Sequence, residues 1–226
     1  MEKYQARLLG PPDLDAIMAL HREVIASLGD KKNVFFCERD AEFFAAIMAG
    51  TGLVAGLIDG DELVASAALR RLQPDEEATC IKAGISPARL PDTGRGHGMM
   101  VAPAHRGRGL QRRLGPFLRA EGRRRGIHDV VGVIHGSNVP SLRNGLATGY
   151  RVIAVTHKGD VESLLLHYVF GAPTKYRLHR EIEATDYASQ RRALAAGLRG
   201  FNLRTHAKGH YLQYGRQLSD ERGSDA

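Results

Sequence analysis

The sequence is poor in cysteine and contains no long apolar run. Its 226 residues include two cysteines, Cys37 and Cys80, which are far apart and belong to no C-x-x-C pair. This argues against a disulfide framework and a cysteine-based metal site. The longest uncharged stretch, Phe43 to Ile58, contains three glycines and is shorter than the roughly 20 residues that cross a bilayer. The first residues also lack the apolar core of a secretory signal. We therefore expect a cytoplasmic protein with no membrane segment.

Acidic residues are almost absent from residues 104–126, which carry eight arginines and a single acid, Glu121. The whole chain has 32 Lys and Arg against 25 Asp and Glu, a net charge of +7. The rest of the chain therefore holds 24 basic and 24 acidic residues and is formally neutral. A nucleic-acid binder usually spreads its basic side chains over several elements, whereas here one segment holds the whole excess. The pattern favours a compact polyanion, with an arginine-rich helix on a phosphate backbone as the alternative.

The same segment begins with a glycine turn that suits an anion. An apolar run over 99–101 stops before Pro103, and Gly107 and Gly109 then precede a stretch of helical periodicity, 110–125. Glycines let the backbone curl so that successive N–H groups point one way, and a helix start adds partial positive charge there. The predicted ligand is a pyrophosphate.

The expected elements alternate along the chain and predict an α/β (α+β) fold. Strands are expected at 4–9, 53–58, 63–69, 96–101, 130–134, 151–156 and 163–170. Helices are expected from Pro11 to Ile25, from Asp40 to about Gly50, at 110–125 and at 139–148. The helix at 110–125 should bury Leu114, Phe117 and Leu118 and expose its arginines. Residues 71–93, rich in Pro, Asp and Glu, are expected to form a long loop.

Residues 171–226 are expected to extend a domain that spans 1–170. Helical spacing over Ala184–Arg199 and alternating runs at 201–205 and 211–214 around Lys208-Gly209 predict a helix followed by a hairpin. Two roles stay open for this extension. It is either a structural or dimer-forming element, which would make the protein a homodimer, or a lid over a substrate.

Two motifs resemble those of the GNAT superfamily of N-acetyltransferases. One is the strand, the turn Arg106-Gly107-Arg108-Gly109 and the long helix after it. The other is Asn138-x-x-Ser141 followed by Gly149-Tyr150-Arg151, about thirty residues further on and in the family's order. The resemblance covers roughly residues 4–170. It implies a GNAT-like mixed sheet, splayed open between its fourth and fifth strands, that binds acetyl-CoA as a co-substrate.

The resemblance also implies which residues hold acetyl-CoA. Strand N–H and C=O groups would meet the pantetheine arm and the thioester carbonyl, from Met99, Met100 and Val101. Consecutive backbone amides would wrap the pyrophosphate, from Arg106, Gly107, Arg108, Gly109, Leu110 and Gln111. Asn138 would bond the pantetheine or the substrate side of the cleft, with Ser141 and Arg143 nearby. For Asn138, a plain place at a helix N-terminus is the alternative.

The chain departs from the family pattern at three positions. Gln111 stands where a small residue is usual, which should alter packing but keeps the backbone amide. Gly145 stands where a tyrosine often protonates the departing thiolate, and Tyr150, His135 and Tyr168 are weaker candidates for that acid. His97 stands where a glutamate base is often found. An imidazole of ordinary pKa, near 6.5, can accept a proton from an amine directly or through water. His97 is therefore the candidate catalytic base, with an ordinary strand histidine as the alternative.

The function implied is acetyl transfer from acetyl-CoA to a primary amine, by direct attack in a ternary complex and without a metal. The acceptor, a small molecule or a peptide, is not identified by the sequence, although acids of 71–93 such as Glu76 could meet a cationic amine. A CoA-binding sensor or scaffold without turnover is one alternative, kept open by Gln111 and Gly145. A nucleic-acid binder that uses the arginine-rich helix is another.

Overall fold

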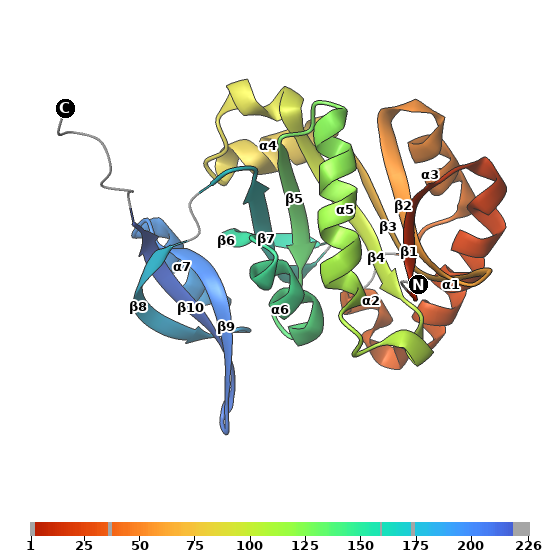
Figure 1. The fold of residues 1–226 in the computed structure, drawn as a ribbon. Coiled ribbons are helices and arrows are strands. Elements are labelled where there is room, and N and C mark those ends of the chain that lie inside the picture. Colours follow the sequence, from red (N-terminus) through yellow and green to blue (C-terminus); the bar gives the residue numbers. More distant parts are fainter. Residues whose placement is uncertain (1–2, 36–37, 159, 173–174, 219–226) are drawn as a thin grey trace, which may run out of the picture. The chain divides into compact units, whose positions relative to one another are not determined.

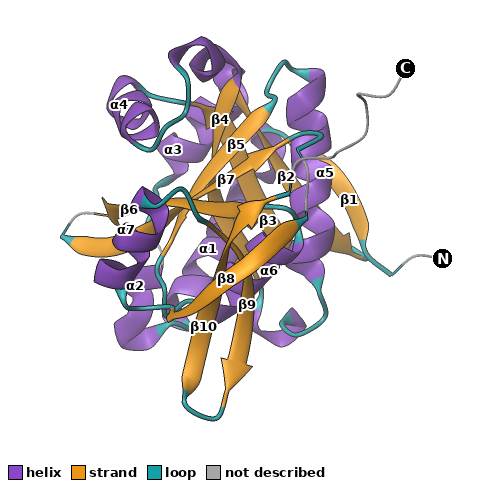
Figure 2. Cartoon of the chain, turned by 90° about the vertical axis from the view of Figure 1, so that its left-hand side faces the viewer, coloured by secondary structure: helices purple, strands orange, loops and turns teal. Residues whose placement is uncertain are grey.

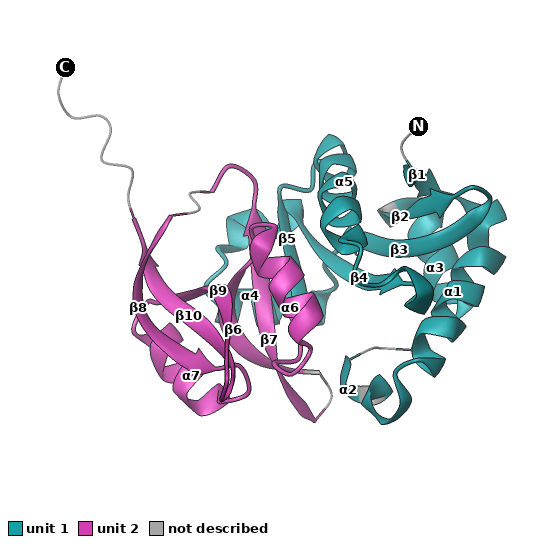
Figure 3. Ribbon diagram, turned by 60° about the horizontal axis from the view of Figure 1, so that its bottom comes forward, with its two compact units in different colours: residues 1–132 teal, residues 133–226 magenta. Residues whose placement is uncertain are grey.

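The computed structural model describes residues 3–35, 38–158, 160–172 and 175–218. Cys37 and Gly159 lie outside these ranges. The chain divides into two compact units, residues 1–132 and 133–226, which Figure 3 colours separately. We describe each unit by itself. The domain boundary expected near residue 170 stays a prediction.

The first unit is built on five strands in the order β1-β2-β3-β4-β5. Their bounds are Gln5–Leu9, Gly52–Asp59, Glu62–Arg71, Thr93–Val101 and Asp129–Ile134. Strands β1 to β4 are antiparallel neighbours, and β5 runs parallel to β4. The predicted hairpin of β2 and β3 is confirmed, and it turns at Gly60 with a φ of 62°, a conformation that glycine adopts at little cost.

Helices cover both faces of this sheet (Figure 1). Helix α1, Leu14–Ala26, follows the short turn Pro11–Asp13, and α3, Ala41–Ala46, begins after Asp40, whose carboxylate accepts a hydrogen bond from the backbone N–H of Phe43. Both pack into a core with Ala68 and Met100 of the sheet. Helix α5, Leu110–Arg124, covers the opposite face, and α2 is one turn at Lys32–Phe35.

Helix α5 confirms the predicted segment, but its arginines do not all face outward. Leu114 and Leu118 are buried as expected, whereas Phe117 is half-buried and Arg119 is buried. The guanidinium Nη1 of Arg119 lies 3.4 Å from where a Cβ on Gly115 would stand. The missing side chain one turn earlier therefore leaves room for Arg119 to lie back along the helix.

The expectation of a long loop over 71–93 is wrong. Helix α4 spans Pro74–Lys82, and a 3₁₀ segment spans Pro87–Asp92. The proline occupies the first helical turn, where its missing N–H would be unpaired in any case, and three acids follow it in that turn, where the helix dipole favours them. The same residue types that indicated a loop are therefore the start signal of a helix.

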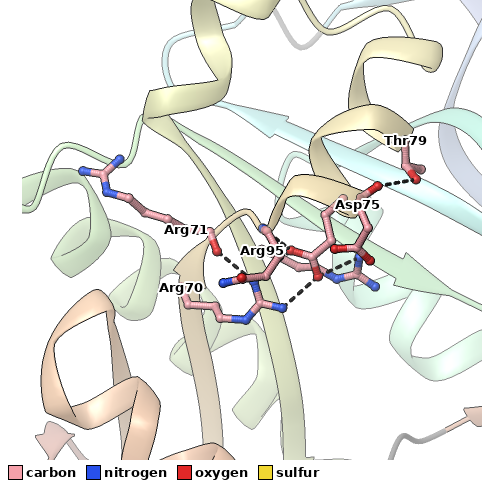
Figure 4. A network of polar contacts seen from close by, with 7 residues as sticks. Arg70, Arg71, Asp75, Thr79 and Arg95 are labelled. Carbon is pink, nitrogen blue, oxygen red and sulfur yellow. Dashed lines mark hydrogen bonds and ion pairs between the residues drawn. The ribbon is translucent and has the colours of Figure 1, made fainter.

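Glu76 links α4 to the sheet through ion pairs with two arginines, Arg70 and Arg95, which Figure 4 labels. Arg70 of β3 donates two hydrogen bonds of 2.8 Å to its carboxylate, and Arg95 of β4 forms an ion pair at 3.1 Å. The backbone N–H of Gln73 donates a further bond of 2.8 Å. Burial raises the pKa of Glu76, but these hydrogen bonds and positive charges outweigh it, and the pKa lies below the ordinary value. The carboxylate is therefore held in its charged form.

The second unit holds the other five strands, in the order β7-β6-β9-β10-β8. Their bounds in chain order are Arg151–Lys158, Val161–Val169, Tyr176–Glu183, Arg199–His206 and Gly209–Gln217. The predicted hairpins of β6 with β7 and of β9 with β10 are confirmed. Strand β8 pairs along most of β10 and was not expected; Figure 2 shows it beside the hairpin. Its side chains are mostly exposed, so no alternation of apolar residues marks it.

Two helices complete the second unit. Helix α6 spans Val139–Ala147 as expected, whereas α7 spans only Tyr187–Ala195 of the predicted Ala184–Arg199. The fully buried Tyr214 of β10 donates a hydrogen bond of 2.8 Å to Gln190 of α7. This bond anchors the predicted helix to the predicted hairpin.

The described residues contain neither a candidate membrane-spanning helix nor a candidate metal site. No helix there is both long and apolar enough to cross a membrane. No group of three or more His, Cys, Asp and Glu side chains there could hold a metal ion.

Replacing Glu76 by Gln should destabilise the first unit by about 3 kcal/mol at neutral pH, because two partly buried guanidinium groups lose their counter-charge. The folded-state pKa is depressed, so this contribution is complete above the ordinary value and is lost as pH falls through the folded pKa. Urea unfolding at pH 7 and at acid pH measures the difference. Asp75→Asn, an exposed position on the same turn, is the matched control. An equal effect of both substitutions would contradict this role of Glu76.

Candidate acetyl-CoA site

Strand β4 loses its neighbour on one edge part-way along its length. Its register with β5 comprises three pairs, Thr93 with Asp129, Gly94 with Val130 and Arg95 with Val131. Among the described residues no further β4–β5 pair follows, although β4 continues to Val101. The backbone groups on this edge from Gly96 onward are therefore available to a ligand. This is the splay predicted between the fourth and fifth strands.

A β-bulge lies in the part of β4 that pairs with β3 but not with β5. Ala68 pairs with His97 and Ser66 with Met100, so Gly98 and Met99 together stand opposite Ala67. Gly98 has a φ of 55°, in the left-handed region that glycine occupies without strain. A bulge interrupts the ladder and redirects backbone groups. Peptide groups therefore turn away from β3 at this point.

The predicted pantetheine residues begin within the bulge at Met99, and the side chains of Met99 and Met100 point away from the free edge. The terminal methyl of Met99 lies 3.7 Å from where a Cβ on Gly115 of α5 would stand. Met100 is buried in the core on the opposite face, with Phe44 and Ile17. The free edge of β4 is therefore lined by main-chain atoms, as a chain of amides such as pantetheine requires.

The turn between β4 and α5 has the geometry of an anion cradle. Gly107 and Gly109 have φ values of 77° and 73°, and no atom lies within 4 Å of where a Cβ would stand on either. Residues 106–109 are exposed, and Gly109 is the N-cap of the 15-residue helix α5. Within the described part of the chain, the amides of residues 107–109 donate to no backbone acceptor. A phosphate group fits this site because exposed amides and a helix start converge there.

Arginines of this turn and of helix α5 form hydrogen bonds that hold the turn to residues distant in sequence. Arg106 donates to the hydroxyl of Ser27 at 2.6 Å, and Arg108 donates to the hydroxyl of Tyr4 at 3.0 Å. Arg113 donates to the backbone oxygen of Tyr4. The sequence indicates these arginines only as a local source of positive charge. Their second role, and the part of Tyr4 and Ser27 in it, carries no local signal because the partners are distant in sequence.

His97 lies on β4 immediately before the bulge. Its ring meets the ring of Phe43 edge-on, with 5.3 Å between the centroids, and its Nε2 is buried without a hydrogen bond among the described residues. Burial, followed by the positive charges of Arg70 and Arg95, lowers the pKa of His97 to about 3. The imidazole is therefore neutral at physiological pH, and it is a much weaker base than the ordinary pKa near 6.5 suggested.

The second motif lies in the other unit, at the start of α6. Asn138 is the N-cap, and its side chain accepts a hydrogen bond of 3.3 Å from the backbone N–H of Ser141. The capping alternative for Asn138 is thus confirmed, and its contact with coenzyme stays a prediction. Arg143 donates to Thr205 of β9 at 2.8 Å, so its guanidinium contacts the C-terminal hairpin.

The candidates for the acid also lie in the second unit. A Cβ at Gly145 would stand 3.4 Å from Leu166, at ordinary van der Waals distance. The rings of Tyr150 and Tyr168 are 5.5 Å apart. The Nδ1 of His135 and the hydroxyl of Ser137 are 2.7 Å apart. The role of these side chains in proton transfer stays a prediction.

Comparison with solved structures identifies the architecture. The GNAT domain of S. lividans PAT matches with a TM-score of 0.56 and 15% identity, over 74% of this chain and 90% of that one. A GCN5-related N-acetyltransferase from Kribbella flavida matches with a TM-score of 0.57 and 20% identity, over 75% and 99%. The chain has the GNAT fold. The Salmonella typhimurium protein yncA, solved with its cofactor acetyl-CoA, also matches, with a TM-score of 0.57 and 19% identity over 74% and 94%.

The splay, the bulge and the glycine turn all lie in the first unit. No protein-family model and no curated protein matches the sequence. The likeness therefore rests on the arrangement of the backbone, in agreement with a site lined by main-chain atoms.

Alanine at Gly107 or Gly109 should weaken CoA binding about tenfold, because the left-handed conformation costs a residue with a Cβ roughly 1–2 kcal/mol and the amides would shift to relieve it. Calorimetric titration with CoA measures the change. Gly60→Ala is the matched control, since Gly60 also has a positive φ of 62° and open space around it but lies in the β2–β3 hairpin. The control should lose stability and keep its affinity. Equal affinities in all three variants would contradict the assignment of the cradle.

Proposed function

We propose that this protein transfers the acetyl group of acetyl-CoA to a primary amine. The observation that carries the proposal is the continuity of the free edge of β4 with the exposed amides at the start of α5. The two parts are joined directly, since Arg106 at the turn reaches back to the backbone oxygen of Val101 at 3.4 Å. Acetyl-CoA presents a diphosphate, a chain of amides and a thioester in that order. The cradle suits the diphosphate, the strand edge suits the chain of amides, and the bulge suits the thioester.

In the reaction, the amine nitrogen attacks the carbonyl carbon of the thioester. A backbone N–H at the bulge of Gly98 and Met99 would donate to the carbonyl oxygen as negative charge develops on it, an effect that a preorganised donor exerts without reorganisation. A C–N bond forms and the C–S bond breaks. The nitrogen loses one proton and the departing thiolate gains one. The products are the acetylated amine and the free thiol of CoA.

Deprotonation of the amine is the larger barrier of the two proton transfers. An alkylamine with a pKa near 10.4 is neutral in only about one molecule in a few thousand at pH 7. A histidine with a pKa of about 3 cannot hold the proton of such an ammonium. His97 is therefore not the base, and the amine reacts after it has lost its proton to water. This revises the general-base role that its position suggested.

The thiolate needs less assistance. Its pKa is near 8.5, so it can leave without a dedicated acid and take its proton from solvent. A glycine at position 145 is therefore compatible with turnover.

Release of free thiol from acetyl-CoA, measured against a panel of primary amines, tests the proposal. Amine-dependent release, with the acetylated product identified by mass spectrometry, is the expected result. Calorimetric binding of acetyl-CoA without thiol release from any amine would favour a non-catalytic sensor or scaffold. Affinity for DNA or RNA that falls steeply with added salt and is not competed by CoA would favour a nucleic-acid binder.

The pH dependence should reflect the acceptor and not His97. For an acceptor amine with a pKa above 9, kcat/KM should rise about tenfold per pH unit between pH 6 and 9, because only the neutral amine reacts. His97→Gln keeps a neutral polar group and should keep this slope. Thiol release measured across the range checks both proteins. A plateau beginning near pH 6.5 in the wild type, absent from the variant, would show that His97 is a general base.

A further inference from the structure

Positive charge gathers around His97, on the face of β4 that Phe43 contacts. Arg95 lies two residues before His97 on the same strand. Arg95 pairs in register with Arg70 of β3. Arg39 places its guanidinium carbon 4.5 Å from the centre of the Phe43 ring, and that ring meets His97 edge-on. All three arginines are close enough to lower the pKa of His97. The region is thus a cluster of three guanidinium groups around a neutral imidazole.

Two arginines of this cluster share the carboxylate of Glu76. Glu76 takes two hydrogen bonds from Arg70 and one ion pair from Arg95, and the side chains of the three residues are 9%, 13% and 26% exposed. Arg70 and Glu76 thus form a closed, bidentate pair. Arg95 is the more exposed arginine and uses less of its donor capacity on Glu76. The sequence suggested Glu76 for a cationic amine, but its oxygens are already engaged.

Arg39 supplies the least compensated charge of the cluster. Its Nε is buried and makes no hydrogen bond among the described residues, and it forms no ion pair there within 4 Å. Its backbone N–H donates to Nε2 of the buried His21 at 3.2 Å, which fixes the chain at this point. Burying a donor of a charged group without a partner is costly. An anionic ligand beside the guanidinium group would offset this charge.

We propose that the acceptor is an amine that also carries an oxyanion, in the first place a carboxylate, which Arg39 and Arg95 bind. The inference rests on the proposed function and names its substrate class. Its geometry follows from β4, since His97 directly precedes the bulge where the acetyl group would lie. An acceptor whose oxyanion meets the two arginines would direct its amine along β4 toward the bulge and the thioester carbonyl. An amino acid has both groups at short separation.

The test compares each acceptor with its uncharged counterpart. Thiol release from acetyl-CoA is measured with L-amino acids and with the matching amino-acid carboxamides, and kcat/KM is expressed per concentration of neutral amine, because the carboxamide lowers the pKa of the neighbouring amine. Free acids should show at least tenfold higher kcat/KM, since a hydrogen bond to a charged group is stronger than one to a neutral group. Aminoalkyl phosphonates form a third arm. If they exceed the amino acids, the oxyanion is confirmed and the source is a phosphate-bearing amine.

Substitutions of Arg39 distinguish a specific contact with the oxyanion from a general effect of positive charge. In Arg39→Gln the preference for acids over amides should fall to within about threefold, through KM more than kcat, and Arg39→Lys should restore part of it. Arg22→Gln removes the same charge from an exposed position on α1 and should leave the preference unchanged. Amides acetylated as well as acids by the wild type would overturn the inference and leave the acetyltransferase proposal intact.

A readout without turnover keeps the two proposals distinguishable. Calorimetry measures the binding of acids and amides to the protein in the presence of CoA. Tighter binding of acids, lost in Arg39→Gln, supports the inference even where turnover is slow. If CoA binds but no acid binds or reacts better than its amide, the inference is wrong. If neither CoA binding nor thiol release occurs, the proposed function fails first.

Discussion

The candidate site depends on one interruption of hydrogen bonding. Strand β5 pairs with β4 at three residue positions and at no further position among those described, and the candidate site is built on the edge that this leaves. An unpaired strand edge inside a fold is a liability unless something covers it. Here the bulge at Gly98 and Met99 and the glycine turn at 107–109 continue the edge. A row of main-chain donors and acceptors then runs from the middle of β4 to the start of α5.

Positive charge serves two purposes in the first unit. At the turn, Arg106, Arg108 and Arg113 hold the loop against Tyr4 and Ser27, and the backbone is left to meet the anion. Around His97, Arg70 and Arg95 share the carboxylate of Glu76, and burial together with the charges of these two arginines and Arg39 lowers the pKa of the imidazole. The net charge of +7 therefore says little about either region. What matters is which guanidinium groups have partners and which do not.

Elements that depend on local chemistry could be predicted, and those that depend on distant partners could not. Gly60 marks a hairpin, and Asp40 caps a helix, through bonds to residues at most three positions away. Helix α4 had equally local signals in Pro74 and the acids after it, but proline and charge are typical of loops as well. Strand β8 forms only because β10 lies beside it, and it has no apolar alternation of its own. The burial of Arg119 similarly depends on Gly115.

The amino-acid sequence by itself determined the glycine turn, its helix and the order of the motifs, because short-range sterics and capping bonds depend only on neighbours in the chain. It also determined that His97 lies on the strand before the turn. Tertiary structure decided what that histidine can do. Its basicity is lowered by burial and by arginines at positions 70 and 95, and the electrostatic field at a side chain depends on distances in space that spacing along the chain does not specify.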